Sequence, residues 1–419
     1  MSSSSEAYVQ KHLRFNFTVG MFDGGFFGLG IGFASFAAII PLFVSHLTDS
    51  ALLIGLVPAI HNVGWQLPQL LTAGWVSGAK RHKPLMLWMT INERVPFLGL
   101  ALVALYAPFT TKQTTLIMTF LMLIWQGLGA GLTANPWMNM VIKVIPRELH
   151  GTFFGTQSAA YNGMGGISAI IAGLILDKIA MPYNYSLCFV LAFAALCISY
   201  AVLSTTREPD RSVDESKPPR AYLHKSLEIL KRDKNFQIFL AVRMLSQFAG
   251  MGFSFYIIYA VWKFGMSDAA AGIMVAILLI GQVVLSPFMG RWGDRWSHRG
   301  VMSLGALGAM LSAIFAWHAT SADWFYVIFI LEAIGTVAIW TIPVALSVSF
   351  AEKEEDRPLY IGLSNTLCAP FTILAPVFGG WLADAASFRL MFLISAICGL
   401  LMAAVLWFVM KDPTEGNFG

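Results

Sequence analysis

The stretch that decides the fold is Gly290-Arg291-Trp292-Gly293-Asp294-Arg295-Trp296-Ser297-His298-Arg299-Gly300. It is short and densely charged, and it lies between two long apolar segments. Charged residues are rare inside membrane-spanning helices, whereas Lys and Arg gather in the short cytoplasmic loops between them. The stretch therefore predicts a charged hinge between two helices that cross a membrane.

A weaker copy of this stretch lies in the first half of the chain, at residues 74–83. Three residue pairs share a spacing of 216 positions: Gln66 and Gln282, Gly74 and Gly290, and His82 and His298. Four further pairs share a spacing of 207 positions: Pro136 and Pro343, Gly155 and Gly362, Gly173 and Gly380, and Asp177 and Asp384. Paired repeats of this kind are typical of membrane transporters, which bind substrate between the repeats.

The composition indicates a protein that is surrounded by lipid. Of the 419 residues, 57% are hydrophobic and 12% are charged, whereas soluble proteins carry about 25% charged residues. A helix needs about 20 apolar residues to cross the hydrocarbon layer, and lipid leaves the backbone no other hydrogen-bonding partner than itself. We therefore predict an all-α integral membrane fold with twelve transmembrane helices in two pseudo-symmetric six-helix halves. The predicted segments are 17–45, 52–77, 84–106, 114–142, 151–178, 184–204, 236–262, 269–293, 300–319, 324–349, 359–385 and 389–410.

The distribution of Lys and Arg predicts the orientation. With the N-terminus in the cytoplasm, 21 of the 27 Lys and Arg residues fall on cytoplasmic segments, as the positive-inside rule requires. We expect an N-terminal half at 1–205, a cytoplasmic linker at 206–235 and a C-terminal half at 236–419. Both termini are then cytoplasmic, and the protein is expected in the plasma (inner) membrane.

Five ionisable residues lie inside predicted spans: Asp23, Glu93, Arg94, Arg243 and Glu332. A charge near the bilayer centre costs at least about 2.5–3.5 kcal/mol, so each is expected to face a cavity or a partner. Asp23 and Arg243 are candidates for a charge pair or for opposite walls of a site, with snorkelling to the interface as the alternative. Glu93 and Arg94 are adjacent, point about 100° apart and are not expected to face one partner. Glu332 suits a proton carrier or a structural, hydrogen-bonded carboxyl.

Uncharged residues of the spans are candidates for the same pathway. Each could also make a hydrogen bond between helices, which is the alternative role. The candidates are Gln66, Asn135, Gln157, Asn162 and Trp340.

The charged stretch also carries a family resemblance. Gly290, Asp294, Arg295 and Arg299 match the pattern Gly-x-x-x-Asp-Arg-x-Gly-Arg-Arg/Lys, by which the chain resembles the major facilitator superfamily of membrane transporters. The first-half copy retains Gly74, and there Gly78 stands in place of the acid. The resemblance implies the fold of that superfamily and transport by alternating access.

The resemblance also implies a gate. The acid of the pattern, Asp294, is expected to dock near the start of the fifth span, at residues 150–152, with Arg147 close by. Such a carboxylate is stabilised by the free N–H groups of a helix N-terminus. A local ion pair with Arg291 or Arg295 is the alternative.

Two departures separate the chain from proton-driven drug exporters of the superfamily. Those exporters usually carry an Arg three residues before a Gln-Gly pair in the fourth span, where this chain has Leu123. They also carry a Gly-Pro-x-x-Gly-Gly element in the fifth span, whereas residues 163–166 here lack the proline.

We predict a secondary active transporter of a small organic solute, with proton coupling. The alternatives are a proton-driven multidrug efflux antiporter, a uniporter, and, from another class, a non-transporting receptor or an intramembrane enzyme. No phosphate-binding Gly-Lys-Ser/Thr loop and no His-Glu-x-x-His motif occurs, so neither ATP nor a metal is expected. The four cysteines lie in apolar segments without metal-like spacing. We expect no enzyme activity, no cofactor and no nucleic-acid partner, and a monomer whose partners are lipid, the solute and possible protons.

Overall fold

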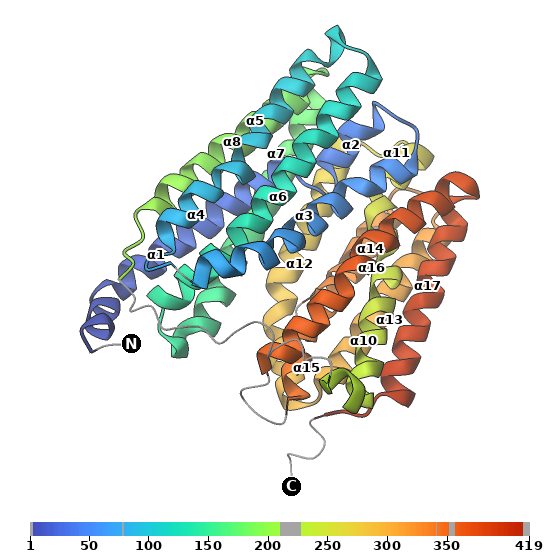
Figure 1. Cartoon of the computed structure of the whole chain (residues 1–419). Coiled ribbons are helices and arrows are strands. Elements are labelled where there is room, and N and C mark those ends of the chain that lie inside the picture. Colours follow the sequence, from blue (N-terminus) through green and yellow to red (C-terminus); the bar gives the residue numbers. More distant parts are fainter. Residues whose placement is uncertain (1–2, 78, 210–227, 341, 352–356, 414–419) are drawn as a thin grey trace. The chain divides into compact units, whose positions relative to one another are not determined.

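The computed structural model describes residues 3–77, 79–209, 228–340, 342–351 and 357–413, and within these ranges it contains helices and no β-strand (Figure 1). The first sequence half forms α1 (Ser3–Phe33), α2 (Ile39–Ser45), α3 (Ala51–Ser77), α4 (Lys83–Met89), α5 (Ile91–Tyr106), α6 (Lys112–Val144), α7 (His150–Lys178) and α8 (Tyr183–Ser204). The second forms α10 (Lys234–Ala249), α11 (Tyr256–Phe264), α12 (Asp268–Arg295), α13 (His298–His318), α14 (Trp324–Trp340), α15 (Ile342–Ser349), α16 (Arg357–Ala385) and α17 (Phe388–Ala404). The predicted all-α membrane fold is confirmed.

The predicted segments follow these helices closely. Each of the twelve corresponds to one helix or to two consecutive helices. Within the described ranges, eight helical segments are long and apolar enough to cross a membrane. The number of twelve spans stays a prediction.

Three predicted segments are divided rather than continuous. The first is divided between α1 and α2, the third at Thr90, and the seventh by a 3-10 turn at Met251–Phe255. Glycines lie beside two of these breaks, Gly32 before the first and Gly250 at the seventh, and glycine lowers helix propensity by about 1 kcal/mol. Divided helices in transporters are found where the chain lines a cavity.

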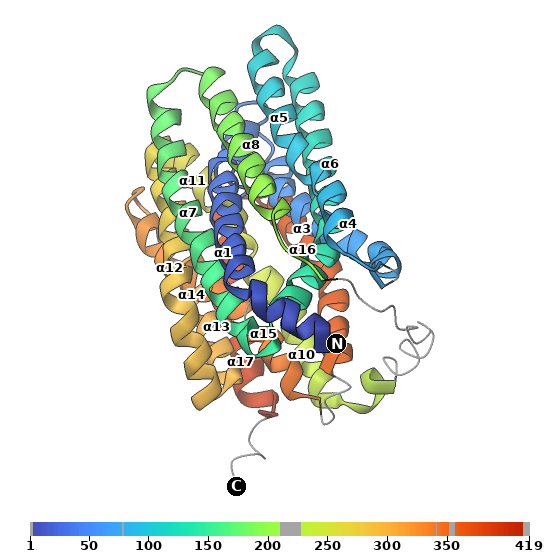
Figure 2. The same ribbon diagram turned by 90° about the vertical axis from the view of Figure 1, so that its left-hand side faces the viewer.

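The helices pack into two units. Unit 1 comprises Met1–Asp49, Val57–Ser216 and Ser267–Leu279, and unit 2 comprises Ser50–Leu56, Lys217–Met266 and Ile280–Gly419. In unit 1, α1 packs against α7 and α8, and α5 packs against α6 and α8 (Figures 1 and 2). In unit 2, α13 packs against α14 and α17, and α10 packs against α16 and α17. The predicted half boundaries at 205 and 236 stay a prediction, because most of the linker lies outside the described residues.

Glycine brings α1 and α7 unusually close together. A Cβ atom added to Gly28 would collide with the backbone carbonyl of Tyr161, and one added to Gly32 would collide with the carbonyl of Gly165. Small residues allow such close approach between transmembrane helices. The packing of α1 on α7 therefore depends on the absence of a side chain at these positions.

Each unit joins its first long helix, α1 or α10, to a residue in the segment that follows its last long helix, α8 or α17. In unit 1, Asn16 Oδ1 accepts from Arg207 N (2.9 Å), and Asn16 Nδ2 donates to Arg207 O (3.0 Å). In unit 2, Asn235 Oδ1 accepts from Lys411 N (3.0 Å), and Asn235 Nδ2 donates to Lys411 O (2.7 Å). We call these two arrangements the terminal clasps. Both clasps are double hydrogen bonds of the same form. The two asparagines lie 219 positions apart in the sequence, and their partners Arg207 and Lys411 lie 204 positions apart.

An acidic residue directly after each clasp binds the start of the third predicted span of its own unit. Glu208 accepts from His82 N and Lys83 N, both at 2.8 Å, and pairs with Lys143 Nζ at 2.9 Å. Asp412 accepts from the hydroxyl of Ser297, the residue that caps α13. The repeat is therefore visible in hydrogen bonds as well as in helix order.

The repeated aspartates Asp177 and Asp384 also have matching roles. Asp384 accepts hydrogen bonds from Ser50 Oγ (2.8 Å), Ala51 N (2.7 Å) and Leu52 N (3.0 Å) at the start of α3, all in unit 2. Asp177 accepts from Ala269 N (3.1 Å) at the start of α12, both in unit 1. Each aspartate thus satisfies N–H groups that a helix N-terminus leaves without an intrahelical partner.

Candidate functional site

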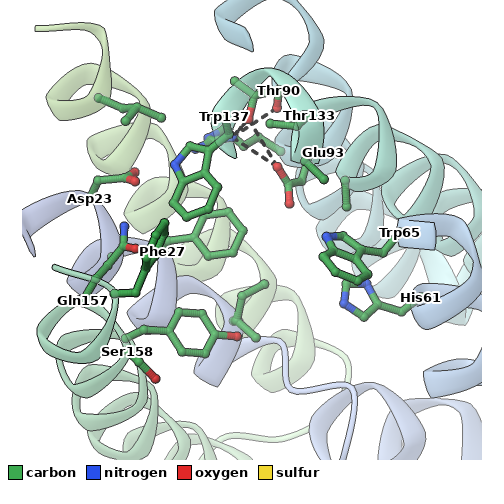
Figure 3. Close-up of a pocket in the computed structure, with 18 of the residues that line it drawn as sticks. Asp23, Phe27, His61, Trp65, Thr90, Glu93, Thr133, Trp137, Gln157 and Ser158 are labelled. Carbon is green, nitrogen blue, oxygen red and sulfur yellow. Dashed lines mark hydrogen bonds and ion pairs between the residues drawn. The ribbon is translucent and has the colours of Figure 1, made fainter. Parts of the chain in front are cut away.

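A cavity of about 450 Å³ lies inside unit 1 (Figure 3). Residues from α1, α3, α5, α6, α7 and α8 line it, together with Thr90 at the break between α4 and α5. Its size is within the range of ligand pockets, about 300–1,000 Å³. Four of the predicted pathway residues line it: Asp23, Glu93, Arg94 and Gln157.

One continuous network joins the charged residues of this cavity. Ser199 Oγ, from α8, donates to Asp23 Oδ1 (2.7 Å) and accepts from Arg94 Nη2 (3.1 Å). Arg94 Nη1 lies 3.5 Å from Glu93 Oε2, and Thr90 Oγ1 donates to the same Glu93 oxygen (3.2 Å). Asp23, Glu93 and Arg94 are 4%, 7% and 4% exposed. The network links α1, α5 and α8 through buried charges that compensate one another, as burial requires.

The guanidinium of Arg94 is held on all sides. Nε donates to Leu196 O (3.0 Å), and Nη1 donates to the carbonyl and the hydroxyl of Thr90. Its carbon lies 5.6 Å from the ring centre of Phe27 and 5.9 Å from that of Tyr200. Cation–π contacts of this kind stabilise a cation by about 0.5–2 kcal/mol. Arg94 is therefore a fixed part of the wall.

The structure corrects the expectation for the Glu93–Arg94 pair. These adjacent residues were expected to face different partners, yet both line the cavity and both contact Thr90. The arginine side chain is long enough to turn back along α5 to the residue four positions earlier, where the helix is broken. The angle between the two Cα–Cβ bonds therefore does not separate the charged ends.

Aromatic side chains form much of the remaining wall. Phe27, Trp65, Trp137, Phe154 and Tyr161 all line the cavity. The indole of Trp137 points toward Asp23 (Figure 3). The cavity thus combines flat apolar surfaces with a few polar groups, the usual make-up of a small-molecule site.

A histidine lies on the α3 side of the cavity. His61 Nδ1 is 2.8 Å from Gln126 Oε1, and the His61 ring stacks on Phe36 with centroids 3.9 Å apart. Gln126 is fully buried, and its Nε2 has no hydrogen-bond partner within the described residues. His61 is therefore fixed in orientation by contacts on two sides.

The other predicted pathway residues of unit 1 lie near the cavity but not in its wall. Asn162 is buried in α7 and donates to Ser158 Oγ (3.3 Å), and Ser158 lines the cavity. Asn135 donates to the carbonyl of Gln69, and Gln66 is half-buried in α3. Asn135 thus makes the helix–helix contact that was its alternative role.

The two predicted charges of unit 2 are also buried. Arg243 is 6% exposed, and its Nη2 donates to Asn365 Oδ1 (3.3 Å). Glu332 is 4% exposed, with the hydroxyl of Ser312 as a hydrogen-bonding neighbour. The pairing of Asp23 with Arg243 stays a prediction. The side chain of Trp340 lies outside the described residues.

The charged stretch is helical for most of its length, which corrects the predicted hinge. α12 includes Gly290 and continues to Arg295, and α13 begins at His298. Arg299, the last residue of the pattern, donates to Met410 O (2.8 Å) within unit 2.

The predicted gate involves residues whose side chains are outside the described part of the chain. The side chains of Asp294 and Arg147 lie outside the described residues, and Gly74 lies in a part of α3 whose side chains are not described. Residues 147–149 form a 3-10 turn before α7. The docking of Asp294 at residues 150–152 therefore stays a prediction.

Sequence reasoning missed several residues of the network and the wall, notably Thr90, Trp137 and Ser199. Ser and Thr are common in transmembrane helices and there usually bind their own backbone, so they carry little signal. No group of His, Cys, Asp and Glu that could hold a metal ion occurs within the described ranges.

Comparison with known sequences identifies relatives over part of the chain. A sequence model of the Major Facilitator Superfamily matches residues 23–262 and 239–419. The chain is 27% identical to Multidrug resistance protein 1 of Bacillus subtilis, 26% to Multidrug resistance protein 2 of the same organism, and 30% to the class E tetracycline resistance protein of Escherichia coli. These matches cover 35%, 44% and 35% of this chain and 38%, 46% and 35% of the three relatives, less than half of each.

Comparison with solved structures extends the likeness to nearly the whole chain. The nucleoside transporter NupG matches with a TM-score of 0.75 and 13% identity, over 94% of this chain and 100% of that one. A D-xylose–proton symporter matches with a TM-score of 0.69 and 15% identity, over 95% and 98%. A bacterial homologue of the human lysosomal transporter Spinster, in an inward-facing conformation, matches with 0.67 and 13%, over 97% of both chains. At these identities the likeness concerns the fold.

Proposed function

Because the chain belongs to the Major Facilitator Superfamily and is a multi-pass membrane transporter, we propose that it moves a small organic solute by secondary active transport, driven by protons. The observation that carries this proposal is the buried network of Asp23, Glu93 and Arg94 in the wall of an open cavity. Ionisable groups at such depth are costly and mark substrate or proton pathways in membrane proteins. A purely structural network would not need a cavity beside it.

Asp23 is the proposed proton carrier. Its carboxylate accepts from Ser199, which in turn accepts from Arg94, so one oxygen of Asp23 is linked to the guanidinium through a single hydroxyl. A proton on Asp23 removes the negative charge that this chain of hydrogen bonds stabilises. The link between α1 and α8 then weakens, and α1 is free to move relative to α8. Proton uptake is thereby coupled to a change in helix packing.

The setting of the protein is part of the same proposal. From the Lys and Arg distribution we place both termini in the cytoplasm and the chain in the plasma (inner) membrane, as a monomer. Transport itself requires neither a cofactor nor catalytic chemistry.

A multidrug efflux antiporter is the second candidate. It is supported by the partial likeness to two multidrug resistance proteins and a tetracycline resistance protein, and by the aromatic wall of the cavity. Leu123, where such exporters usually carry an Arg, is fully buried and apolar, which opposes it. Uniport is the third possibility, and the proton experiment below separates it from the other two.

The test uses purified protein and a panel chosen from the relatives: tetracycline, a nucleoside, D-xylose and a dipeptide. A ligand of the folded state raises the unfolding temperature, and the compound that does so is then followed in proteoliposomes with an imposed proton gradient. We expect uphill movement of that compound, abolished by Asp23→Asn, with downhill exchange retained. Uphill movement of equal rate in Asp23→Asn, Glu93→Gln and Glu332→Gln would exclude proton coupling through these carboxyls.

A further inference from the structure

The cavity of unit 1 offers hydrogen-bond acceptors rather than donors at its charged end. All three nitrogens of Arg94 donate to groups of the protein, and its faces lie against Phe27 and Tyr200. An anionic substrate would need those N–H groups, since Arg binds carboxylates and phosphates through them. The one guanidinium in the wall is therefore committed to the protein.

The carboxylates are only partly committed. Thr90 and Arg94 bind Glu93 through Oε2, and among the described residues no group donates to Glu93 Oε1. Figure 3 shows this second oxygen pointing into the cavity. Asp23 faces the same space. Glu93 Oε1 is thus accessible from the cavity, and the site is suited to a ligand that supplies a hydrogen-bond donor to it.

The net charge of the wall also favours a ligand that carries a hydrogen-bond donor and a positive charge. Its ionisable residues are Asp23, Glu93, Arg94, His61 and Tyr161. With both carboxyls ionised and the imidazole and the phenol neutral, the wall carries a formal charge of −1. Aromatic rings surround this end, Trp65 among them at 47% exposure. Ring faces attract organic cations as well as apolar surfaces.

We propose that the substrate of this cavity is an organic monocation with an aromatic or apolar body, whose positive charge lies against Glu93 and Asp23 and whose body lies among the aromatic rings. This inference rests on the proposed function and adds to it the chemical class of the solute. A proton on either carboxyl removes the negative charge that holds the cation. Cation and proton therefore compete, and cation binding weakens as pH falls.

Binding of tetraphenylphosphonium tests the proposal, with tetraphenylborate as a probe of the same shape and opposite charge. We expect purified protein to bind the phosphonium, to bind the borate at least 10-fold more weakly, and to release protons into weakly buffered solution when the phosphonium binds. Equal binding of the two probes would overturn the proposal.

Variants locate the binding site. Loss of a hydrogen bond to a charged group corresponds to roughly 10- to 100-fold in affinity, which we expect for Glu93→Gln. Trp65→Leu, which leaves the buried network intact, should weaken binding about 2- to 30-fold, the range of a cation–π contact. Glu148→Gln, at an exposed carboxylate of unit 1 outside the cavity, is the control and should bind as the unchanged protein does. Undiminished binding to both folded cavity variants would place the cation elsewhere and overturn the proposal.

The outcomes also separate this inference from the proposed function. If the phosphonium does not bind but a neutral compound of the panel is moved uphill, the transporter proposal stands and the cation class is wrong. If the phosphonium binds as expected but no proton gradient drives its movement, the class stands and the coupling is wrong.

Discussion

The two repeats carry opposite chemistry at corresponding positions. In unit 1 the network consists of Asp23, Thr90, Glu93, Arg94 and Ser199. Three spacings align the repeats. The clasp residues Asn16 and Asn235 align the first spans of the two repeats at a spacing of 219 positions, and Arg207 and Lys411 align the sixth spans at 204. The residue pairs that share a spacing of 216 positions align the third spans. At these spacings the counterparts in unit 2 are Val242, Ala306, Ala309, Met310 and Ala403.

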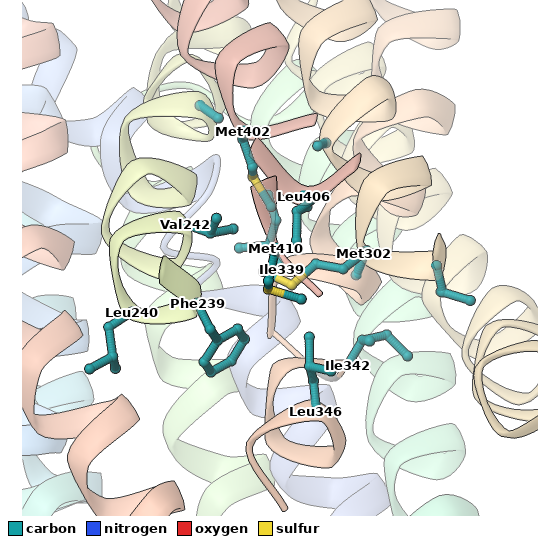
Figure 4. Close-up of a cluster of buried hydrophobic side chains, with 14 of the residues drawn as sticks. Phe239, Leu240, Val242, Met302, Ile339, Ile342, Leu346, Met402, Leu406 and Met410 are labelled. Carbon is teal, nitrogen blue, oxygen red and sulfur yellow. The ribbon is translucent and has the colours of Figure 1, made fainter. Parts of the chain in front are cut away.

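Four of the five unit 2 counterparts belong to a hydrophobic core or pack against it. Val242, Ala306 and Ala309 belong to one cluster of buried residues, and Ala403 packs against it (Figure 4). The same scaffold thus tolerates either an apolar core or a buried ionic network at its centre. Since buried ion pairs are often no more stabilising than hydrophobic residues of similar size, stability does not explain the network of unit 1.

Replacing the unit 1 network by its unit 2 counterparts gives the largest expected effect. Arg94→Met alone leaves two carboxyls buried without their cation, which costs about 3–5 kcal/mol. The fivefold variant Asp23→Val, Thr90→Ala, Glu93→Ala, Arg94→Met and Ser199→Ala should recover most of that loss and still show no uphill transport. Unfolding followed by tryptophan fluorescence in detergent measures the first effect, and proteoliposome uptake the second. A fivefold variant less stable than Arg94→Met would contradict the inference that the same scaffold tolerates an ionic network or an apolar core at these positions.

The second-largest loss of stability is expected where α1 and α7 approach each other closely. The counterpart of Gly28, 219 positions later, is Gln247. Gly28→Gln forces a side chain against the backbone of Tyr161 and should destabilise by about 3 kcal/mol, as overpacking does. Gln247→Gly should cost only about 1 kcal/mol, the difference in helix propensity. Thermal unfolding of both variants compares them, and equal losses would mean that the two first helices pack alike.

Loss of either terminal clasp should lower stability by the same amount. This contrasts with the unit 1 network and its unit 2 counterparts, which differ in chemistry. Asn16→Ala and Asn235→Ala each remove two hydrogen bonds to backbone, and each should cost about 2 kcal/mol. The measurement is the shift in unfolding midpoint of the two single variants and of the double variant. Additive shifts are expected because the clasps share no partner. A large loss from one clasp alone would show that only one repeat depends on it.

The repeated aspartates should give the smallest effects, and unequal ones. Asp384 accepts three hydrogen bonds and Asp177 accepts one at the helix starts described above. We expect a cost of about 1 kcal/mol for Asp384→Ala and about 0.5 kcal/mol for Asp177→Ala, within the range of helix caps. Hydrogen exchange at Ala51 and Ala269 reports each contact directly. Faster exchange at Ala269 in Asp177→Ala than at Ala51 in Asp384→Ala would contradict the expected order of the two effects.

The sequence predicted the helices well and the network only in part. Long apolar segments locate helices because lipid leaves the backbone no alternative, and the cost of buried charge pointed to Asp23, Glu93 and Arg94. The break at Thr90 leaves no trace in hydropathy, and the contacts of Glu93 and Arg94 with Thr90 depend on side-chain conformations that the sequence pattern does not give. Ser199 is one of several polar residues in a mostly apolar helix, and its role depends on a neighbour 176 positions away. Contacts of that range are not encoded in local pattern.

The terminal clasp of unit 1 also has a consequence for how the chain is made. Its two partners, Asn16 and Arg207, are both present once the ribosome has passed residue 207, before any of α10 has been translated. Domains generally fold as units, with the N-terminal one first during synthesis. The double hydrogen bond can therefore register the completion of the first repeat while the second is still being translated.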